Sequence, residues 1–150
     1  MNPTPPLPPS DPAAHLRLVL WRANKAMEAM ETAHLQARGL CLTDFAILEV
    51  LLHKGPLPVN VIGQKVLLTS GSITTAISRL QERKLVSRTP DELDRRVIRV
   101  QLTAAGTAFI QGHFQKHLDC LRKAAGVLSE AEQTELVRLL KKLGLHAAGL

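Results

Sequence analysis

Apolar positions in this chain recur mainly at the three- and four-residue steps of amphipathic helices. The first run begins after Asp11-Pro12, a pair that suits an N-cap and the first helical position, and it ends near Arg38-Gly39. Its apolar members are Leu16, Leu20, Ala23, Met27 and Met30. This spacing predicts one long helix at the start of the chain.

The middle of the chain predicts three shorter helices. Thr43-Asp44 is expected to cap the first of them, and the proline-containing segment 53–58 is expected to end it. The second is short, and the third extends over about residues 70–83. The apolar residues of the third helix are Ile73, Ala76, Ile77 and Leu80. They lie on one face of a helix, which predicts a single buried stripe.

The segment 87–103 has the pattern of a β-hairpin. Two short alternating runs surround a polar link that carries Asp94, Arg95 and Arg96. Helical patterns return after the hairpin and again after Ser129, which begins a capping-box sequence. The order of a long helix, three short helices, a hairpin and two more helices predicts a mainly α fold with a small β-hairpin wing, a winged helix-turn-helix.

The composition indicates a basic, single-domain protein. The 150 residues carry 19 Lys and Arg against 13 Asp and Glu, a net charge of +6, which favours polyanionic partners such as nucleic acid. No apolar run approaches the about 20 residues that span a bilayer, and the first residues lack the regions of a secretory signal, so we expect a cytoplasmic protein. The two cysteines are too few for a disulfide framework or a zinc site.

The motifs of common enzymes are not found in the sequence. It contains no glycine-rich phosphate loop, no Gly-x-Ser-x-Gly elbow and no zinc-protease motif. We therefore expect neither an enzyme nor a cofactor. His113 and His117 have a helical spacing that can hold a metal, but no third ligand is evident, so we expect no metal site.

Two surfaces could bind DNA. The outer face of the third short helix carries small hydroxyl side chains that allow a close approach to a major groove; the alternative is a solvated helix face. The hairpin carries Arg88, Arg95 and Arg96, and a guanidinium at its tip can enter a minor groove while Asp94 holds one arginine by a bidentate pair. The alternative is a solvated hairpin with a surface ion pair.

The segment from Leu67 to Gly106, LLTSGSITTAISRLQERKLVSRTPDELDRRVIRVQLTAAG, resembles the core of the MarR family of bacterial transcription regulators. The most specific part is the pattern LV…R…DRR…V.LT..G, and the likeness extends over the helices from about Asp11 to Gly144. The family often has glycine where Lys84 stands. Glycine suits a left-handed C-cap, and lysine there costs about 1 kcal/mol, so either the helix ends differently here or the strain is tolerated.

The resemblance implies a homodimeric, sequence-specific DNA-binding regulator, a repressor that a small aromatic or phenolic effector releases from a pseudo-palindromic operator. It implies a flexible proline-rich arm at 1–10 and one domain at 11–150, with a DNA-binding lobe at about 43–103 and dimerisation helices at about 11–38 and 104–146. The recognition helix would contact DNA through Thr69, Ser70, Ser72, Thr74, Thr75, Ser78 and Arg79. The wing would do so through Arg88, Arg95 and Arg96, with Asp94 orienting the arginines.

An effector pocket and a reactive thiol are further expectations, each with a structural alternative. Trp21, Arg22 and His53 are candidates for the pocket, and His15 and His34 are weaker candidates. Each of them is otherwise a core, interface or solvated residue.

Cys41 is a candidate for redox sensing, because it lies close to a helix N-terminus, which can make a thiol reactive. The alternative is a buried small hydrophobe, and Cys120 is expected to be packed in the interior. A winged-helix protein-interaction module without DNA binding is an alternative to the regulator as a whole.

Overall fold

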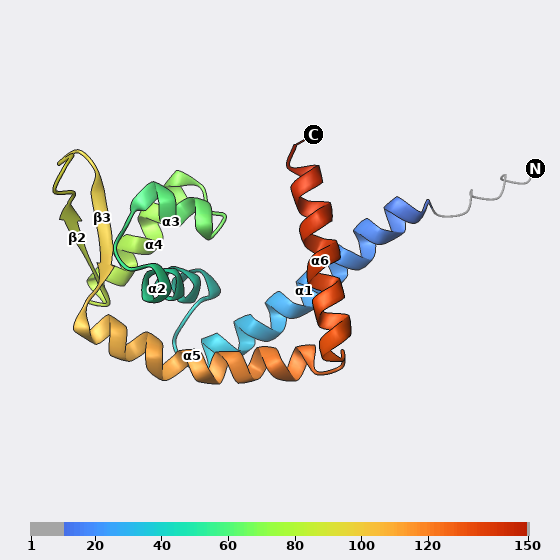
Figure 1. Ribbon diagram of the computed structural model, residues 1–150. Helices are drawn as coiled ribbons and strands as arrows, with labels where there is room; N and C mark the ends of the chain where they lie inside the picture. Colours follow the sequence, from blue (N-terminus) through green and yellow to red (C-terminus); the bar gives the residue numbers. More distant parts are fainter. Residues whose placement is uncertain (1–10, 150) are drawn as a thin grey trace, which may run out of the picture.

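The computed structural model describes residues 11–149. They form α1 (Pro12–Gln36), α2 (Leu42–Lys54), β1 (Leu57–Pro58), α3 (Val59–Lys65), α4 (Ser70–Glu82), β2 (Val86–Pro90), β3 (Ile98–Leu102), α5 (Ala104–Ala125) and α6 (Glu130–Ala147). Figure 1 shows α2, α3, α4 and the β2–β3 hairpin gathered in one lobe, which α5 joins to α1 and α6. The prediction of a mainly α winged helix-turn-helix is confirmed. The arm expected at 1–10 lies outside the described residues.

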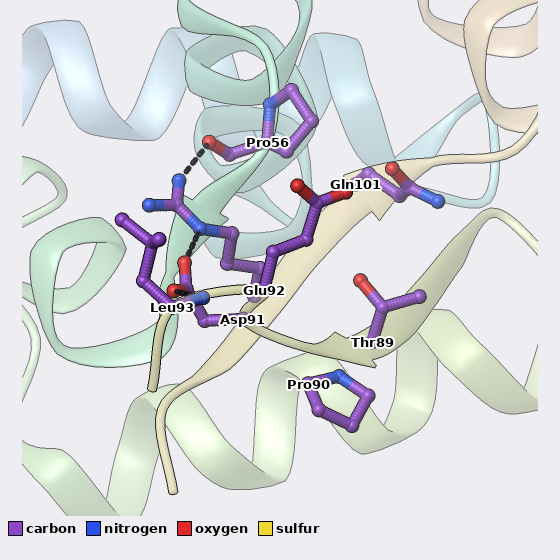
Figure 2. A pocket seen from close by; sticks show the side chains of 8 residues that line it. Pro56, Thr89, Pro90, Asp91, Glu92, Leu93 and Gln101 are labelled. Atoms are coloured by element: carbon purple, nitrogen blue, oxygen red, sulfur yellow. Dashed lines mark hydrogen bonds and ion pairs between the residues drawn. The ribbon is translucent and has the colours of Figure 1, made fainter. Parts of the chain in front are cut away.

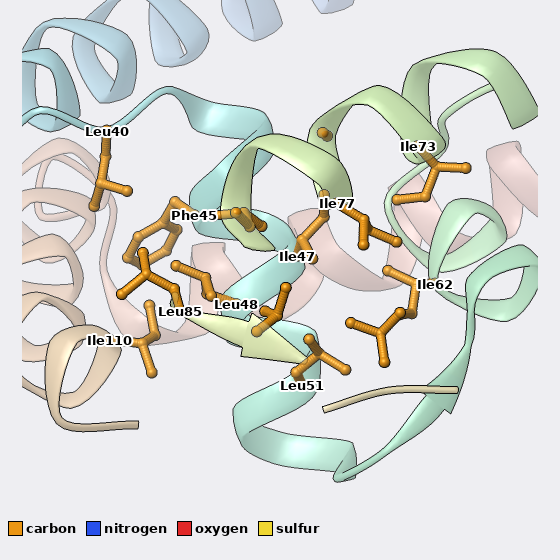
Figure 3. Packing of buried hydrophobic residues seen from close by; sticks show 14 of the residues in the cluster. Leu40, Phe45, Ile47, Leu48, Leu51, Ile62, Ile73, Ile77, Leu85 and Ile110 are labelled. Carbon is orange, nitrogen blue, oxygen red and sulfur yellow. The ribbon is translucent and has the colours of Figure 1, made fainter. Parts of the chain in front are cut away.

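The core of the lobe is formed by α2, α3, α4 and the sheet. All four residues of the predicted stripe on α4 are buried: Ile73, Ala76, Ile77 and Leu80. They belong to one apolar cluster with Phe45 and Leu48 of α2 and Ile62 of α3 (Figure 3). Ile110 of α5 and Val100 of β3 belong to the same cluster. The first helix after the wing is therefore attached to the lobe by burial of apolar surface.

The sheet has three strands in the order β1-β3-β2, all antiparallel. The predicted hairpin is confirmed, and its register places Val86 opposite Leu102. On the other edge of β3, the two residues of β1 place Leu57 opposite Val100. The sequence did not predict β1, because two residues show no alternation.

Most helices begin at a residue whose side chain accepts a backbone hydrogen bond. Asp11 caps α1 and the predicted capping box of Ser129 and Glu132 starts α6, so both predictions are confirmed. The predicted cap of α2 is wrong. Cys41 is the N-cap, with Sγ accepting from the Asp44 amide at 3.4 Å, because the helix begins earlier than expected and Thr43 and Asp44 lie inside its first turn.

The end of α4 contains the one departure from the family pattern that the sequence showed. Lys84 adopts a left-handed backbone with φ of 58°, so the helix ends as it would with glycine and the strain is tolerated. The Lys84 amide donates to the Gln81 carbonyl at 2.8 Å, and the Leu85 amide donates to the Leu80 carbonyl at 3.0 Å. These two bonds form a Schellman motif, and Leu80 and Leu85 are both buried beneath it.

The helices at the two ends of the chain leave apolar side chains uncovered. Residues 12–26 of α1 are exposed except for half-buried Leu18, and no residue of α6 is buried within the described chain. The exposed apolar residues on these helices include Leu16, Leu20, Trp21, Leu136, Leu139, Leu140 and Leu143. No helix among residues 11–149 is both long enough and apolar enough to cross a lipid bilayer.

Candidate nucleic-acid interface

The exposed face of α4 presents the hydroxyl groups that the sequence predicted. Ser70, Ser72, Thr74 and Thr75 are all exposed, and Thr69 caps the helix by accepting from the Ser72 amide. The Thr74 and Thr75 hydroxyls donate to carbonyls one turn earlier, at 2.9 Å and 3.1 Å. Their oxygen lone pairs therefore face outward as acceptors, while the helix start provides backbone donors.

Two hollows flank this face of α4. The first lies between α4 and the start of α2, and its lining residues include Thr43, Thr69, Ser72, Thr75 and Arg79. The second lies between α3, α4 and the wing, and its lining residues include Asn60, Ser70, Thr74, Arg96 and Ile98. The hydroxyl face of α4 thus lies between two hollows, and Arg96 of the wing faces it across the second hollow.

The tip of the wing exposes two adjacent arginines, of which Asp94 binds one. Asp94 accepts two hydrogen bonds at 3.1 Å from the Arg96 guanidinium and one at 3.0 Å from its backbone amide. The Arg96 side chain lowers the pKa of Asp94 below its usual value, so the carboxylate stays ionised. Arg95 is exposed beside this pair. The sequence left open which of the two arginines Asp94 would bind, and in the structure it binds Arg96.

The loop at the tip of the wing is fixed by a second acidic residue that the sequence analysis missed. Asp91 accepts from the backbone amides of Leu93 and Asp94 at 2.9 Å and 3.1 Å, and it is ion-paired with Arg99. Arg99 also donates to the Pro56 carbonyl at 3.3 Å (Figure 2). The Arg99 hydrogen bond lowers the pKa of Asp91 to about 2. The polar character of the turn could be predicted from the sequence, but its contacts with Arg99 on β3, and through Arg99 with Pro56 just before β1, could not.

Two of the predicted DNA-binding arginines make contacts inside the protein. Arg88 of β2 donates to the Ser78 hydroxyl at 2.9 Å and to the Thr74 carbonyl at 3.3 Å, so it joins the wing to α4. Arg79 of α4 forms a two-pronged ion pair with Asp44, and it donates to Cys41 Sγ at 3.4 Å. The Asp44 hydrogen bond raises the pKa of Arg79. Arg88 thus joins β2 to α4, and Arg79 joins α4 to α2.

The candidates for an effector pocket are not brought together in the single chain. Trp21 is 54% exposed and Arg22 is also exposed, both on the N-terminal half of α1. His53 lies at the end of α2, where its ring packs edge-on against Phe114 at 5.2 Å. His15 is exposed on α1. Within residues 11–149, no hydrogen bond, ion pair or aromatic contact joins Trp21, Arg22 and His53 to one another.

A buried histidine that the sequence did not single out as a pocket residue lies where α1, α2 and α5 meet. The His117 ring is 4.2 Å from the Phe45 ring and 5.8 Å from the His34 ring, and its Nε2 is 3.5 Å from a Glu31 carboxylate oxygen. Burial lowers the pKa of His117 and raises the pKa of Glu31. Both groups are therefore shifted towards their neutral forms.

The two cysteines differ in exposure. Cys41 is exposed at the start of α2, so its interpretation as a buried small hydrophobe is wrong, while Cys120 is half-buried on α5. His113 Nδ1 lies 2.7 Å from the Phe109 carbonyl oxygen. Among the described residues, no three or more His, Cys, Asp or Glu side chains are placed to hold a metal.

Comparison with known proteins places this geometry among transcription regulators. A protein-family model described as the MarR family matches residues 34–97. The HTH-type transcriptional regulator MhqR of Bacillus subtilis is 38% identical over 132 residues, which are 88% of this chain and 91% of MhqR. The sequence-based resemblance is thereby confirmed, and these relatives are regulators rather than enzymes.

Two solved structures share the fold. Bordetella bronchiseptica BpsR, described with regulation of its DNA binding by 6-hydroxynicotinic acid, has a TM-score of 0.82 and 24% identity over 91% of this chain and 97% of BpsR. A mutant of E. coli MarR complexed with operator DNA has a TM-score of 0.80 and 22% identity over 89% of this chain and 99% of the other.

Proposed function

Because the chain belongs to the MarR family of DNA-binding transcription regulators, we propose that it acts as a homodimeric repressor of a specific operator, from which a small effector releases it. The operator is a pseudo-palindrome with half-sites about one helical turn apart. Each lobe places α4 in the major groove and the β2–β3 wing in the adjacent minor groove. The protein then works in the cytoplasm, where the operator is accessible.

The observation that carries the proposal is the hollow shared by α4 and the wing. Ser70 and Thr74 line it from the helix, and Arg96 lines it from the hairpin, so hydroxyl acceptors and a guanidinium face one space. A DNA backbone that fills such a space sets the register of the helix, and the hydroxyl groups next to it reach base edges. Arg95 and Arg96 provide the charge that a narrow minor groove attracts.

The dimer is supported by the apolar residues that the single chain leaves uncovered. Leu16 and Leu20 on α1, and Leu139 and Leu143 on α6, are each more than a third exposed although their spacing is that of a buried helix face. Exposed apolar residues on the faces of two long helices are typical of a protein interface. A second copy of this chain covers it, and the two-fold symmetry matches that of the operator.

Arginine replacement in the wing tests the proposal. The wild-type protein first selects duplexes from a random-sequence library, and binding to the selected duplex is then titrated against salt. The Arg95→Ala/Arg96→Ala variant should bind the duplex more weakly, and the slope of log K against log salt should shrink by about 0.9 for each phosphate that the variant no longer neutralises. The control, Arg122→Ala/Lys123→Ala, removes the same charge from the far end of α5 and should change binding little.

The result also separates the regulator from an interaction module. If the wing variant binds the selected duplex as tightly as the control variant does, the wing is scaffold and the DNA-reading role is wrong. If the wild-type protein selects no sequence, the chain is better described as a winged-helix module that binds protein.

Effector release is proposed because BpsR, which has the same fold, is described as regulated by 6-hydroxynicotinic acid. Trp21, Arg22 and His53 remain the candidate pocket residues. Because Trp21 and Arg22 are exposed in the single chain, the pocket requires the second copy. The chain contains one tryptophan and no tyrosine, so its intrinsic fluorescence reports on Trp21 alone. Titration with 6-hydroxynicotinic acid and simple phenols should change this fluorescence at the concentrations that release DNA, and unchanged fluorescence during release would place the pocket elsewhere.

A thiol switch at Cys41 is a second candidate that one contact favours. Cys41 is exposed, and its sulfur accepts from the Arg79 guanidinium of α4 at 3.4 Å. A modified sulfur would disturb the start of α2 and a side chain of the recognition helix together. Treating the protein with a quinone or peroxide should then lower DNA affinity in wild type and not in Cys41→Ser. Equal sensitivity of both proteins would exclude this thiol.

A further inference from the structure

A single buried carboxylate holds the recognition helix. Asp44 lies in the first turn of α2, and the residue is only 2% exposed. Both of its oxygens bind the Arg79 guanidinium, and Arg83 Nη1 lies 3.8 Å from Oδ2. Arg79 and Arg83 are one helical turn apart, so one acidic side chain joins two turns at the end of α4 to the start of α2.

The bond from Asp44 to α4 is directional, unlike the apolar contacts beneath α4. The buried stripe that includes Ile73 and Ile77 keeps α4 on the lobe, but apolar burial is non-directional and constrains the rotation of a helix less tightly than a directional bond does. A planar guanidinium that meets a carboxylate through two parallel bonds fixes both distance and orientation. The rotation of α4 about its axis decides which hydroxyl groups face outward.

Asp44 also lies on the path from the long helix α1 to α4. The N-cap of α2, Cys41, is three residues before Asp44, and α1 ends at Gln36. A displacement of α1 therefore reaches Asp44 through a short connection. On the other side of α4, Arg88 holds Ser78. The recognition helix is thus held by guanidinium contacts on both its α2 side and its wing side.

We propose that Asp44 is a positioning residue for sequence-specific DNA binding, which acts through Arg79 and Arg83 by fixing the rotation of α4. This inference rests on the proposed DNA-reading role of α4. Asp44 touches no DNA in this account, and Arg79 acts chiefly as an anchor. The role differs from a general contribution to charge, because removal of Asp44 should affect specific and non-specific DNA in opposite directions.

The test is Asp44→Asn, which keeps the shape of the side chain and removes its charge. The net charge of the chain rises from +6 to +7, because one acidic residue is lost. General electrostatics then favours tighter binding to every duplex. A positioning role instead predicts weaker binding to the duplex that the wild-type protein selects from a random library, while a scrambled duplex is bound as well as before or better. The ratio of the two affinities should fall by about ten-fold or more, the discrimination that one misread base pair costs.

Asp119→Asn is the matched control. Asp119 is an exposed acid on α5, 3.0 Å from Arg122, so its replacement makes the same change in charge without touching α4. It should leave the ratio of affinities as in wild type. A second variant, Arg79→Lys, keeps the charge and loses the two parallel bonds. It should lower the same ratio even if Asp44→Asn fails to fold, and circular dichroism checks that each variant is folded.

Two outcomes overturn the inference, and they are distinguishable. If the wild-type protein is specific but Asp44→Asn and Arg79→Lys are equally specific, α4 is positioned by its apolar stripe alone and Asp44 has no such role. If the wild-type protein selects no sequence, the proposed function fails, and the inference fails with it.

Discussion

Replacing Gly106 by alanine should force α5 away from the start of the wing. An added Cβ at Gly106 would lie 1.9 Å from the Leu85 carbonyl oxygen and 2.8 Å from its carbonyl carbon. Both are backbone atoms, so no side chain can rotate out of the way. Either α5 or the segment before β2 must move, and this segment contains the left-handed Lys84 that ends α4.

The size of the effect follows from three contributions. Overpacking in a tight contact costs about 1–3 kcal/mol, and the cost lies at or above the upper end here because the obstacle is backbone. The displacement also breaks the hydrogen bonds from the Thr103 amide to the Leu85 carbonyl at 3.1 Å and from the Thr103 hydroxyl to the Lys84 carbonyl at 2.7 Å. Each is worth about 1 kcal/mol.

Alanine also has a higher helix propensity than glycine, which stabilises the folded protein by about 1 kcal/mol and offsets part of this loss. The net loss should be about 4 kcal/mol, or a fall in melting temperature of roughly 8–16 °C for a chain of this size.

Urea unfolding measures this loss. All variants are compared at one protein concentration, because the apparent stability of the proposed dimer would depend on concentration. Gly112→Ala is the control, since it makes the same chemical change in the same helix at a position where an added Cβ meets nothing within 4 Å. It should stabilise the protein by up to about 1 kcal/mol. A Gly106→Ala protein as stable as Gly112→Ala would refute the close approach of α5 to Leu85.

Two further predictions concern strain and pH. Lys84→Gly removes the left-handed strain and should raise the free energy of unfolding by about 1 kcal/mol. The control Lys123→Gly, within helix α5, should lower it by about the same amount. Thermal melts in which both variants shift the melting temperature in the same direction would contradict this. Burial lowers the pKa of His117 below 6.5 in the folded protein, so on acidification the unfolded chain takes up the proton first. The contribution of neutral His117 to the free energy of unfolding is fully present above about pH 6.5. It is lost as the pH falls towards the lower pKa of the folded state. The urea midpoint should therefore drop between pH 7.5 and 5.5 in wild type and in the His15→Asn control, and drop less in His117→Phe. A midpoint that rises on acidification would mean that charged His117 gains more from Glu31 than it loses by burial.

The sequence predicted those features that depend on local spacing. The stripe of α4, the hairpin and the capping box at Ser129 each follow from residues within a few positions of one another, so helical and strand periodicity is sufficient to find them. For Lys84, the family's glycine pointed to a left-handed position, but the structure was needed to show that lysine adopts it.

The sequence did not predict features that depend on partners far along the chain. Asp44 was interpreted as a cap because it lies near a helix start, whereas its partner Arg79 is 35 residues away. The inward direction of Arg88 depends on how β2 lies against α4, which no alternation of polar and apolar residues specifies. The apolar residues of α1 and α6 were assigned correctly to helices, but their exposure became visible only in the fold.

The bridge from Arg88 to Ser78 has a consequence for operator spacing. Because it joins the wing to α4, it couples the two parts of the lobe that are proposed to read DNA. One base pair inserted between half-sites moves the second half-site by about 3.4 Å and turns it by roughly 35°. If the wing and α4 move together, α1, α5 and α6 have to absorb this change. The affinity of the protein should therefore depend strongly on the spacing between half-sites, and it should fall less for a change in base sequence than for a change in operator length.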